Sequence, residues 1–287
     1  MPRKQYAANF YAGASASRIE KFLKGYTPAR FDSPLVAGLV PHAGWDFSGA
    51  VAAKVFKSIE CSRKPETIVL FGTVHHDIRC NAIYPSGSWH TPLGEVQIDE
   101  SLVGGILSRT EGLLEADESA HFHEHSIEVQ MPFLKHFFPC AKAAPIAVLP
   151  DENAPVLGRK VGEFLKESGA NAFVVGTTDL THYGDAYYFA PRGSGPAALE
   201  WIRQNDARII ELAVKMKAEE ILPEATRKKN ACGPGAMAAT VAAARALGST
   251  TGRVIEYTTS YDVMPEPVFR MGVGYVGMVF CGTQRSG

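Results

Sequence analysis

The sequence predicts an α/β sandwich in which helices flank a central, mostly parallel or mixed β-sheet. Short runs of aliphatic and β-branched residues recur without polar alternation, which is typical of strands covered on both faces. Helix-like segments separate these runs, and such alternation favours parallel strands joined by crossover helices. The expected strands are 35–40, 67–71, 145–149 and 171–175.

Helical periodicity supports the second half of this prediction. In the segment 154–168, Leu157, Val161 and Leu165 fall on one face of a helix. A helix with one apolar stripe packs that stripe against the sheet. The expected helices are 49–58, 101–108, 154–168, 196–212 and 235–247.

The end of the chain departs from the alternation. Residues 253–260 and 272–280 have strand-like composition, and Pro265 and Pro267 prevent regular pairing between them. We expect a loop there, with the two strands adding mixed or antiparallel pairing to the sheet. Residues 80–98 also have the pattern of short strands joined by turns.

One further helical pattern, 126–137, contains Pro132, so the helix either begins late or is kinked. No linker in the chain is long enough to separate two domains. Residues 1–287 are therefore expected to form a single domain.

Composition excludes several classes of function. The 29 basic residues nearly balance 30 acidic ones, and no long run of either sign occurs, so neither nucleic acid nor a membrane surface is an expected partner. No stretch reaches the ~18 apolar residues of a spanning helix, and the basic start lacks the apolar region of a secretory signal. Five cysteines without a CxxC pair indicate a reducing compartment. We expect a cytoplasmic protein.

Histidines and acidic residues gather where the expected strands end. The first strand leads into His42, the second into His75 and His76, and the fourth into Asp179 and His182. Ligands of open α/β sheets bind at the carboxyl ends of strands, so these side chains are expected to share one cleft. Neighbours in extended chain point to opposite sides, so only one of His75 and His76 can face it, and spacing does not choose between them.

Cys232 stands immediately before an expected helix start, Gly233-Pro234-Gly235. Backbone N–H groups and the helix dipole at such a place lower the pKa of a thiol. The alternative is a small buried apolar cysteine, which is our interpretation of the remaining four, Cys61, Cys80, Cys140 and Cys281.

Two further clusters carry titratable groups. Asp179 and His182 can form a pair in which the carboxylate orients the imidazole for acid–base catalysis. The alternative is that both belong to an ordinary polar turn. In the string from His121 to His125, we expect His125 near the cleft and His121 and His123 to be exposed.

Five ordered motifs resemble those of the Memo family, whose prokaryotic members are often called AmmeMemoRadiSam system protein B. The resemblance covers nearly the whole chain. The motifs are Pro41-His42-Ala43-Gly44-Trp45 with Ser48-Gly49, His75-His76, Glu124-His125-Ser126-Ile127-Glu128, Asp179-Leu-Thr-His182 and Cys232-Gly233.

The resemblance implies a fold like that of class III extradiol dioxygenases of the LigB type, which hold non-haem Fe(II). It assigns the metal ligands to His42, His76 and Cys232. It also brings three residues of catalytic character to the same cleft, His125, Asp179 and His182.

A thiolate in place of the carboxylate of a His₂-carboxylate triad softens the site, so copper and zinc become compatible alongside iron(II). The resulting hypothesis is one iron or copper ion supporting O₂-dependent or redox chemistry on a small substrate, as in a dioxygenase-like oxidoreductase. His182 would move protons and Asp179 would orient it.

Two alternatives remain open. The cleft can bind a peptide or a partner protein without turnover, in an accessory role to the radical-SAM and AMMECR-type proteins that the family name implies. Cys232 can also act as a nucleophile, with His182 as its base and Asp179 as the orienting group.

Overall fold

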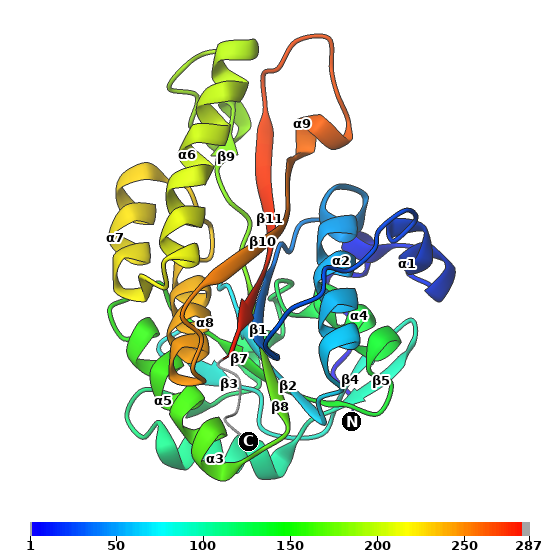
Figure 1. Cartoon of the computed structure of the whole chain (residues 1–287), viewed down its shortest axis with the longest axis vertical. Helices are drawn as coiled ribbons and strands as arrows, with labels where there is room; N and C mark the ends of the chain where they lie inside the picture. Colours follow the sequence, from blue (N-terminus) through cyan, green and yellow to red (C-terminus); the bar gives the residue numbers. More distant parts are fainter. Residues whose placement is uncertain (1, 283–287) are drawn as a thin grey trace.

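The computed structural model describes residues 2–282, in which a large mixed sheet lies between two layers of helices (Figure 1). The strands are β1 Leu35–Val40, β2 Thr67–Gly72, β3 Ala82–Ile83, β4 Ser88–Thr91, β5 Gly94–Gln97, β6 Glu115–Ala116, β7 Lys142–Ala147, β8 Ala172–Thr177, β9 His182–Tyr183, β10 Gly252–Thr259 and β11 Gly272–Cys281. The main sheet has the order β10-β11-β1-β8-β2-β7-β3-β6, with β9 paired to β11, while β4 and β5 form a separate hairpin.

The centre of the sheet is parallel, and antiparallel pairs flank it on both sides. β1 pairs with β8, β8 with β2 and β2 with β7 in parallel, whereas β11 is antiparallel to both β1 and β10. Nearly every residue of the four central strands is buried, as expected for strands covered on both faces. The predicted α/β fold with a mixed sheet is confirmed.

Helices of unequal length cover the two faces (Figure 1). On one face of the sheet, α2 lies on β1, β10 and β11, and α1 and α4 pack against α2. On the other face, α8 lies on β1, β2 and β8, and α5 and α7 pack against the outer side of α8. The α-helices are α1 Ala16–Phe22, α2 Trp45–Ser62, α3 Glu100–Arg109, α4 Met131–Phe137, α5 Ala154–Ser168, α6 Pro196–Val214, α7 Ala218–Lys228, α8 Pro234–Ala246 and α9 Ser260–Val263.

Small side chains let α8 approach its neighbours closely. A Cβ at Gly158 of α5 would overlap the backbone of Ala239 in α8, so the two helices pack nearly backbone to backbone. This contact fixes α8 against the sheet. The beginning of α8 therefore reaches the edge at which β2 and β8 end.

The observed elements differ from the predicted ones in a few places. The strand expected at 145–149 spans 142–147, so it begins three residues and ends two residues earlier, and helix α7 was not predicted because Pro223 lies inside it. Pro132 occupies the first turn of α4, so that helix begins late and is not kinked.

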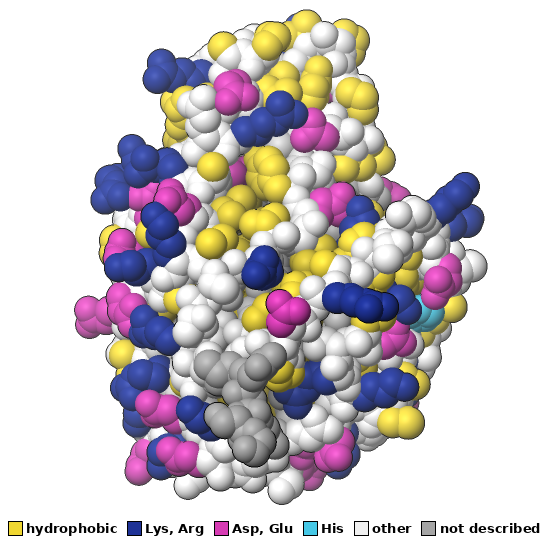
Figure 2. Space-filling model, in the orientation of Figure 1, with side chains coloured by type: hydrophobic (Ala, Val, Ile, Leu, Met, Phe, Trp, Pro, Cys, Tyr) yellow, Lys and Arg dark blue, Asp and Glu magenta, His cyan; other side chains and the backbone are white. Residues whose placement is uncertain are grey.

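The surface carries both signs of charge. Figure 2 shows basic and acidic side chains interspersed on one face, with hydrophobic ones between them, as the near-neutral composition predicts. Among residues 2–282, no helix combines the length and the apolar character that crossing a membrane requires.

Candidate metal centre

A cleft of about 400 Å³ lies at the carboxyl ends of β1, β2 and β8. A larger hollow of about 590 Å³ beside Arg30 and Cys61 has no histidine in its described lining, so volume alone does not mark the site. The cleft, by contrast, combines imidazoles and a carboxylate with apolar side chains at the end of the parallel strands. Its lining includes His42, His75, His125, Asp179, His182, Phe10, Phe47, Tyr187, Met271 and Tyr275.

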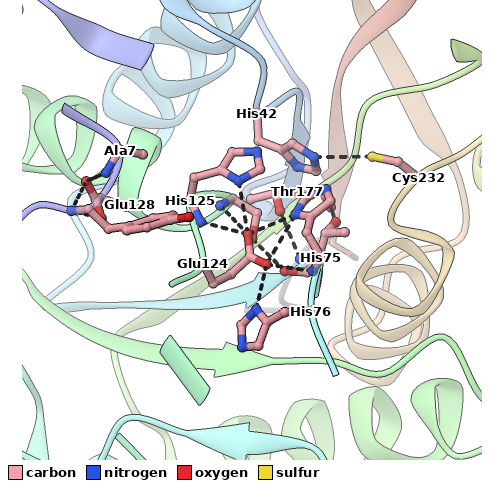
Figure 3. Close-up of polar contacts among 12 residues, drawn as sticks. Ala7, His42, His75, His76, Glu124, His125, Glu128, Thr177 and Cys232 are labelled. Atoms are coloured by element: carbon pink, nitrogen blue, oxygen red, sulfur yellow. Dashed lines mark hydrogen bonds and ion pairs between the residues drawn. The ribbon is translucent and has the colours of Figure 1, made fainter. Parts of the chain in front are cut away.

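His42 occupies the floor of the cleft, directly after β1. Its backbone N–H donates to Asp179 Oδ1 over 2.8 Å, and its ring Nε2 lies 3.2 Å from Cys232 Sγ (Figure 3). The ring is buried, and its Nδ1 has no hydrogen-bond partner among residues 2–282. Burial holds the pKa of His42 well below its usual range, so the imidazole is neutral and has a lone pair available for a metal.

Cys232 reaches His42 because α8 begins at the sheet edge. Its backbone N–H donates to the Asp179 carbonyl over 3.1 Å, and its Sγ accepts from the Asp179 N–H over 3.3 Å. The next residue, Gly233, has no room for a side chain, since a Cβ there would overlap the Thr73 hydroxyl and the Thr177 carbonyl oxygen. Tight packing of the chain therefore sets the position of the thiol.

The ionisation of Cys232 differs from the sequence-based expectation. A helix N-terminus lowers the pKa of a thiol, but burial, followed by the nearby carboxylate of Asp179, raises the pKa of Cys232 above its ordinary value. The imidazole beside its sulfur is that of His42 and not that of His182.

Of the adjacent histidines, it is His75 that joins the cleft. Its ring lies 5.1 Å from that of His42 and stacks on His125 at 4.5 Å between centroids. His76 lies on the side of Glu124 away from His42 (Figure 3). The resemblance pointed to His76, whereas the geometry groups His75 with His42.

Two sets of donor atoms overlap at His42. Ligand atoms of His42, His75 and His125 lie within 4.8 Å of one another, and so do those of His42, Asp179 and Cys232. Imidazole nitrogens with a thiolate and a carboxylate form a donor set suited to zinc, copper or iron. Together with the unpartnered Nδ1 of His42, this composition fits a transition-metal ion.

Asp179 and His182 both lie in the cleft, with different partners from those expected. Asp179 Oδ1 accepts from the backbone N–H groups of His42 and Ala43, and thus braces the turn after β1. His182 Nδ1 lies 3.0 Å from the Leu180 carbonyl oxygen, which fixes a proton on Nδ1 and leaves Nε2 free. Its orienting group is therefore a backbone carbonyl.

Comparison with known proteins now bears on this geometry. The sequence matches the family described as "Memo-like protein" over residues 4–279. The chain belongs to the Memo family. Proteins named "MEMO1 family protein" are similar to it: that of Thermococcus onnurineus is 33% identical over 285 residues, covering 96% of this chain and 97% of its own, and that of Methanococcoides burtonii is 32% identical over 284, covering 97% and 99%.

Among solved structures, an uncharacterized protein of Escherichia coli K12 has a similar fold. The TM-score is 0.53 at 12% sequence identity, over 85% of this chain and 99% of the other. At this identity the likeness concerns the fold alone. It agrees with the α/β architecture expected for a Memo-family protein.

The string from His121 to His125 divides in this Memo-family chain between structural and cleft positions. His121 is fully buried between Tyr84 and Trp89, and its Nε2 lies 3.2 Å from the Ala82 carbonyl oxygen. Burial lowers the pKa of His121 to about 4. The expectation that His121 is exposed is therefore wrong, because it fills a hydrophobic gap.

Sequence reasoning missed an anchor formed by residues near the start of the chain. Arg3 Nη1 donates to Glu128 Oε2 over 2.7 Å, and Glu128 also accepts from the Tyr6 and Ala7 N–H groups and the Tyr11 hydroxyl (Figure 3). This anchor ties the N-terminal segment to the loop that carries His125. The motif containing Glu128 was visible in the sequence, but its partners lie more than a hundred residues away.

Proposed function

We propose that this Memo-family protein binds one redox-capable metal ion, iron(II) or copper, at His42, His75 and Cys232, and uses it in O₂-dependent or redox chemistry on a small substrate. The observation that carries the proposal is the 3.2 Å approach of Nε2 of the buried His42 ring to Cys232 Sγ. Neutral imidazole and sulfur side by side form the start of a soft metal site. Because the His75 ring lies beside that of His42, we propose His75 as the third ligand in place of His76.

Ionisation of the two buried groups supports the proposal. Desolvation disfavours both the imidazolium of His42 and the thiolate of Cys232. A cation between them would compensate the thiolate charge and use the neutral imidazole as it stands. When bound, iron or copper would supply Lewis acidity and electron transfer, whereas zinc would supply only the former.

The surrounding residues suit proton handling. His182 lines the cleft, and because its Nδ1 is held by the Leu180 carbonyl oxygen, its Nε2 is the ring nitrogen with a lone pair. Burial, followed by the charges of His42 and His75, lowers the pKa of His125 to about 4, so this imidazole is also neutral near pH 7. Either ring can accept a proton from a substrate in the cleft. Asp179, in turn, keeps the turn that carries His42 in place.

The apolar side chains at the mouth of the cleft favour a second candidate function, the binding of a peptide or partner protein without turnover. Apolar side chains lie partly exposed there, with Phe47 at 37%, Tyr187 at 39% and Met271 at 51%. Such side chains gain from being covered by an apolar surface. A radical-SAM enzyme and an AMMECR-type protein are the partners to test first, since the resemblance implies them.

The experiment that separates these functions measures turnover and binding on the same preparation. Protein loaded anaerobically with Fe(II) or Cu(I) is screened for O₂ uptake that depends on added catechol-like and other small compounds, with His182→Gln as the matched variant. Substrate-dependent uptake that falls in the variant supports the oxidoreductase. Micromolar partner binding that is unchanged after metal removal, without any uptake, supports the binding module.

A further inference from the structure

We propose that Glu124 is the positioning carboxylate of this metal centre, holding the His75 ring so that its Nε2 atom remains free for the ion and fixing the neighbouring backbone of His125. The inference rests on the proposed function and extends it to a residue that lies outside both sets of donor atoms. Glu124 is a positioning residue here, because it acts through the His75 imidazole.

The contacts at His75 are the first support. Its ring Nδ1 lies 3.0 Å from Glu124 Oε1 and 3.2 Å from Oε2, and its backbone N–H donates to Oε2 over 2.7 Å. A carboxylate opposite Nδ1 fixes the proton on that nitrogen. The lone pair of His75 is then on Nε2, the nitrogen left for the cleft.

The same carboxylate serves His125. The His125 backbone N–H donates to Glu124 Oε1 over 2.8 Å, and its ring Nδ1 lies 3.5 Å from the same oxygen. The rings of His75 and His125 are nearly parallel, with 22° between their planes. One carboxylate therefore holds the His75 ring by a hydrogen bond and the His125 backbone by another, and the His125 ring stacks on the ring that is held. Figure 3 shows Glu124 at the point where these contacts converge.

Saturation of its lone pairs excludes Glu124 as a ligand. Its two oxygens accept from the backbone N–H groups of His75, His125 and Ser126, in addition to the His75 ring. A carboxylate offers about four acceptor positions, so these contacts fill it. The side chain is only 2% exposed.

The backbone that carries Glu124 is fixed as well. Arg3 Nη2 donates to the Glu124 carbonyl over 3.1 Å, and the Ser126 hydroxyl donates to the Thr73 carbonyl over 2.8 Å at the end of β2. Rigid support of this kind keeps ligand geometry when the ion is absent.

The test compares Glu124→Gln with Glu128→Gln. Both carboxylates are 2% exposed and lie four positions apart in the chain, but the hydrogen bonds that Glu128 makes within residues 2–282 go to Arg3, Tyr6, Ala7 and Tyr11 and to no imidazole of the cleft, so it serves as the control. A glutamine at position 124 has one acceptor oxygen where glutamate has two. Its NH₂ group would face N–H donors, so it cannot repeat all the contacts of the carboxylate. The two readouts are zinc affinity by calorimetry, with Zn(II) alone as a redox-silent probe, and ring tautomers from long-range ¹⁵N–¹H NMR of metal-free protein.

We expect the His75 ring of the wild type to carry its proton on Nδ1, with the signal assigned through the His75→Ala variant. In Glu124→Gln this fixed tautomer should be lost and zinc affinity should fall about 10- to 100-fold. Glu128→Gln should lower the melting temperature while keeping the tautomer and, within about threefold, the affinity.

Two results would overturn the inference: a wild-type His75 protonated on Nε2, or a folded Glu124→Gln variant with wild-type zinc affinity and tautomer. If Glu124→Gln does not fold, the wild-type tautomer alone decides. A wild type that binds no metal would contradict the proposed function instead, and the tautomer would still test the positioning role.

Discussion

His42 Nε2 and Cys232 Sγ lie 3.2 Å apart, although 190 positions separate the two residues in the chain. The contact exists because β1 ends and α8 begins at the same edge of the sheet, with the loop that carries Asp179 between them. The Asp179 carboxylate accepts a hydrogen bond from the His42 backbone N–H, and the Asp179 backbone is hydrogen-bonded to Cys232. The same strand-end geometry brings His75 and His182 to the cleft.

His75 and His76 should contribute unequally to metal binding. His75→Ala removes a ring from the group around His42, so zinc or Co(II) affinity should fall at least about tenfold. His76→Ala is the matched control and should stay within about threefold of the wild type, because this ring lies beyond Glu124. Calorimetric titration of both variants checks this, and a larger loss in His76→Ala would favour the ligand set that the resemblance implied.

Gly233→Ala should displace Cys232. The added methyl group would overlap the Thr73 hydroxyl and the Thr177 carbonyl oxygen, so the start of α8 must shift at a cost of about 1–3 kcal/mol. Thermal unfolding and metal affinity should both decline. Gly104→Ala is the control: it lies in α3 with no atom near the new methyl group and should be neutral or stabilising by up to about 1 kcal/mol. Equal behaviour of the two variants would argue against the tight packing at Gly233.

Arg3 should matter for stability beyond an ordinary surface pair. Arg3→Met leaves the Glu128 carboxylate buried without its guanidinium, which costs about 3–5 kcal/mol when one member of a buried pair is removed. Arg79→Met, which breaks an exposed pair with Glu115, should change the free energy of unfolding by less than about 1 kcal/mol. Urea unfolding followed by circular dichroism compares them, and similar midpoints for the two variants would show that the N-terminal anchor is dispensable.

Asp206 should make stability fall as pH rises from about 4 to about 7. Burial raises the pKa of Asp206 to about 7, although hydrogen bonds from Thr181 and Tyr257 oppose this. In that range the unfolded chain loses the proton and the folded chain keeps it, so increasing pH favours unfolding, by at most about 4 kcal/mol. Asp206→Asn removes the titration. Its free energy of unfolding should decline less than that of the wild type between pH 5 and 8, and parallel curves would contradict the account.

Much of the fold follows from local patterns. The strands around 35–40, 67–71 and 171–175 were predictable because they are short, apolar throughout and separated by amphipathic helices. The helix α7 was missed because Pro223 breaks its pattern, and its packing against α8 outweighs the proline. Tertiary contacts, which no local window contains, decide such cases.

The sequence predicted where in the fold the candidate site lies, but it did not predict which side chains contact one another there. Strand ends pointed to His42 and Asp179, and a helix start pointed to Cys232. The choice of His75 depends on the way the chain leaves β2 toward Glu124, a residue 49 positions away. Likewise, the helix N-terminus predicted an acidic thiol at Cys232, whereas burial and the carboxylate of Asp179 raise its pKa. Spacing alone cannot give these partners.

Metal content tests the central claim most directly. Wild-type protein and the Cys232→Ala variant, purified without tag or chelator and loaded anaerobically with Fe(II) or Cu(I), are compared by mass spectrometry after desalting. The account predicts close to one iron or copper ion per wild-type chain and little in the folded variant. No retained metal in the wild type, or equal stoichiometry in both proteins, would contradict it.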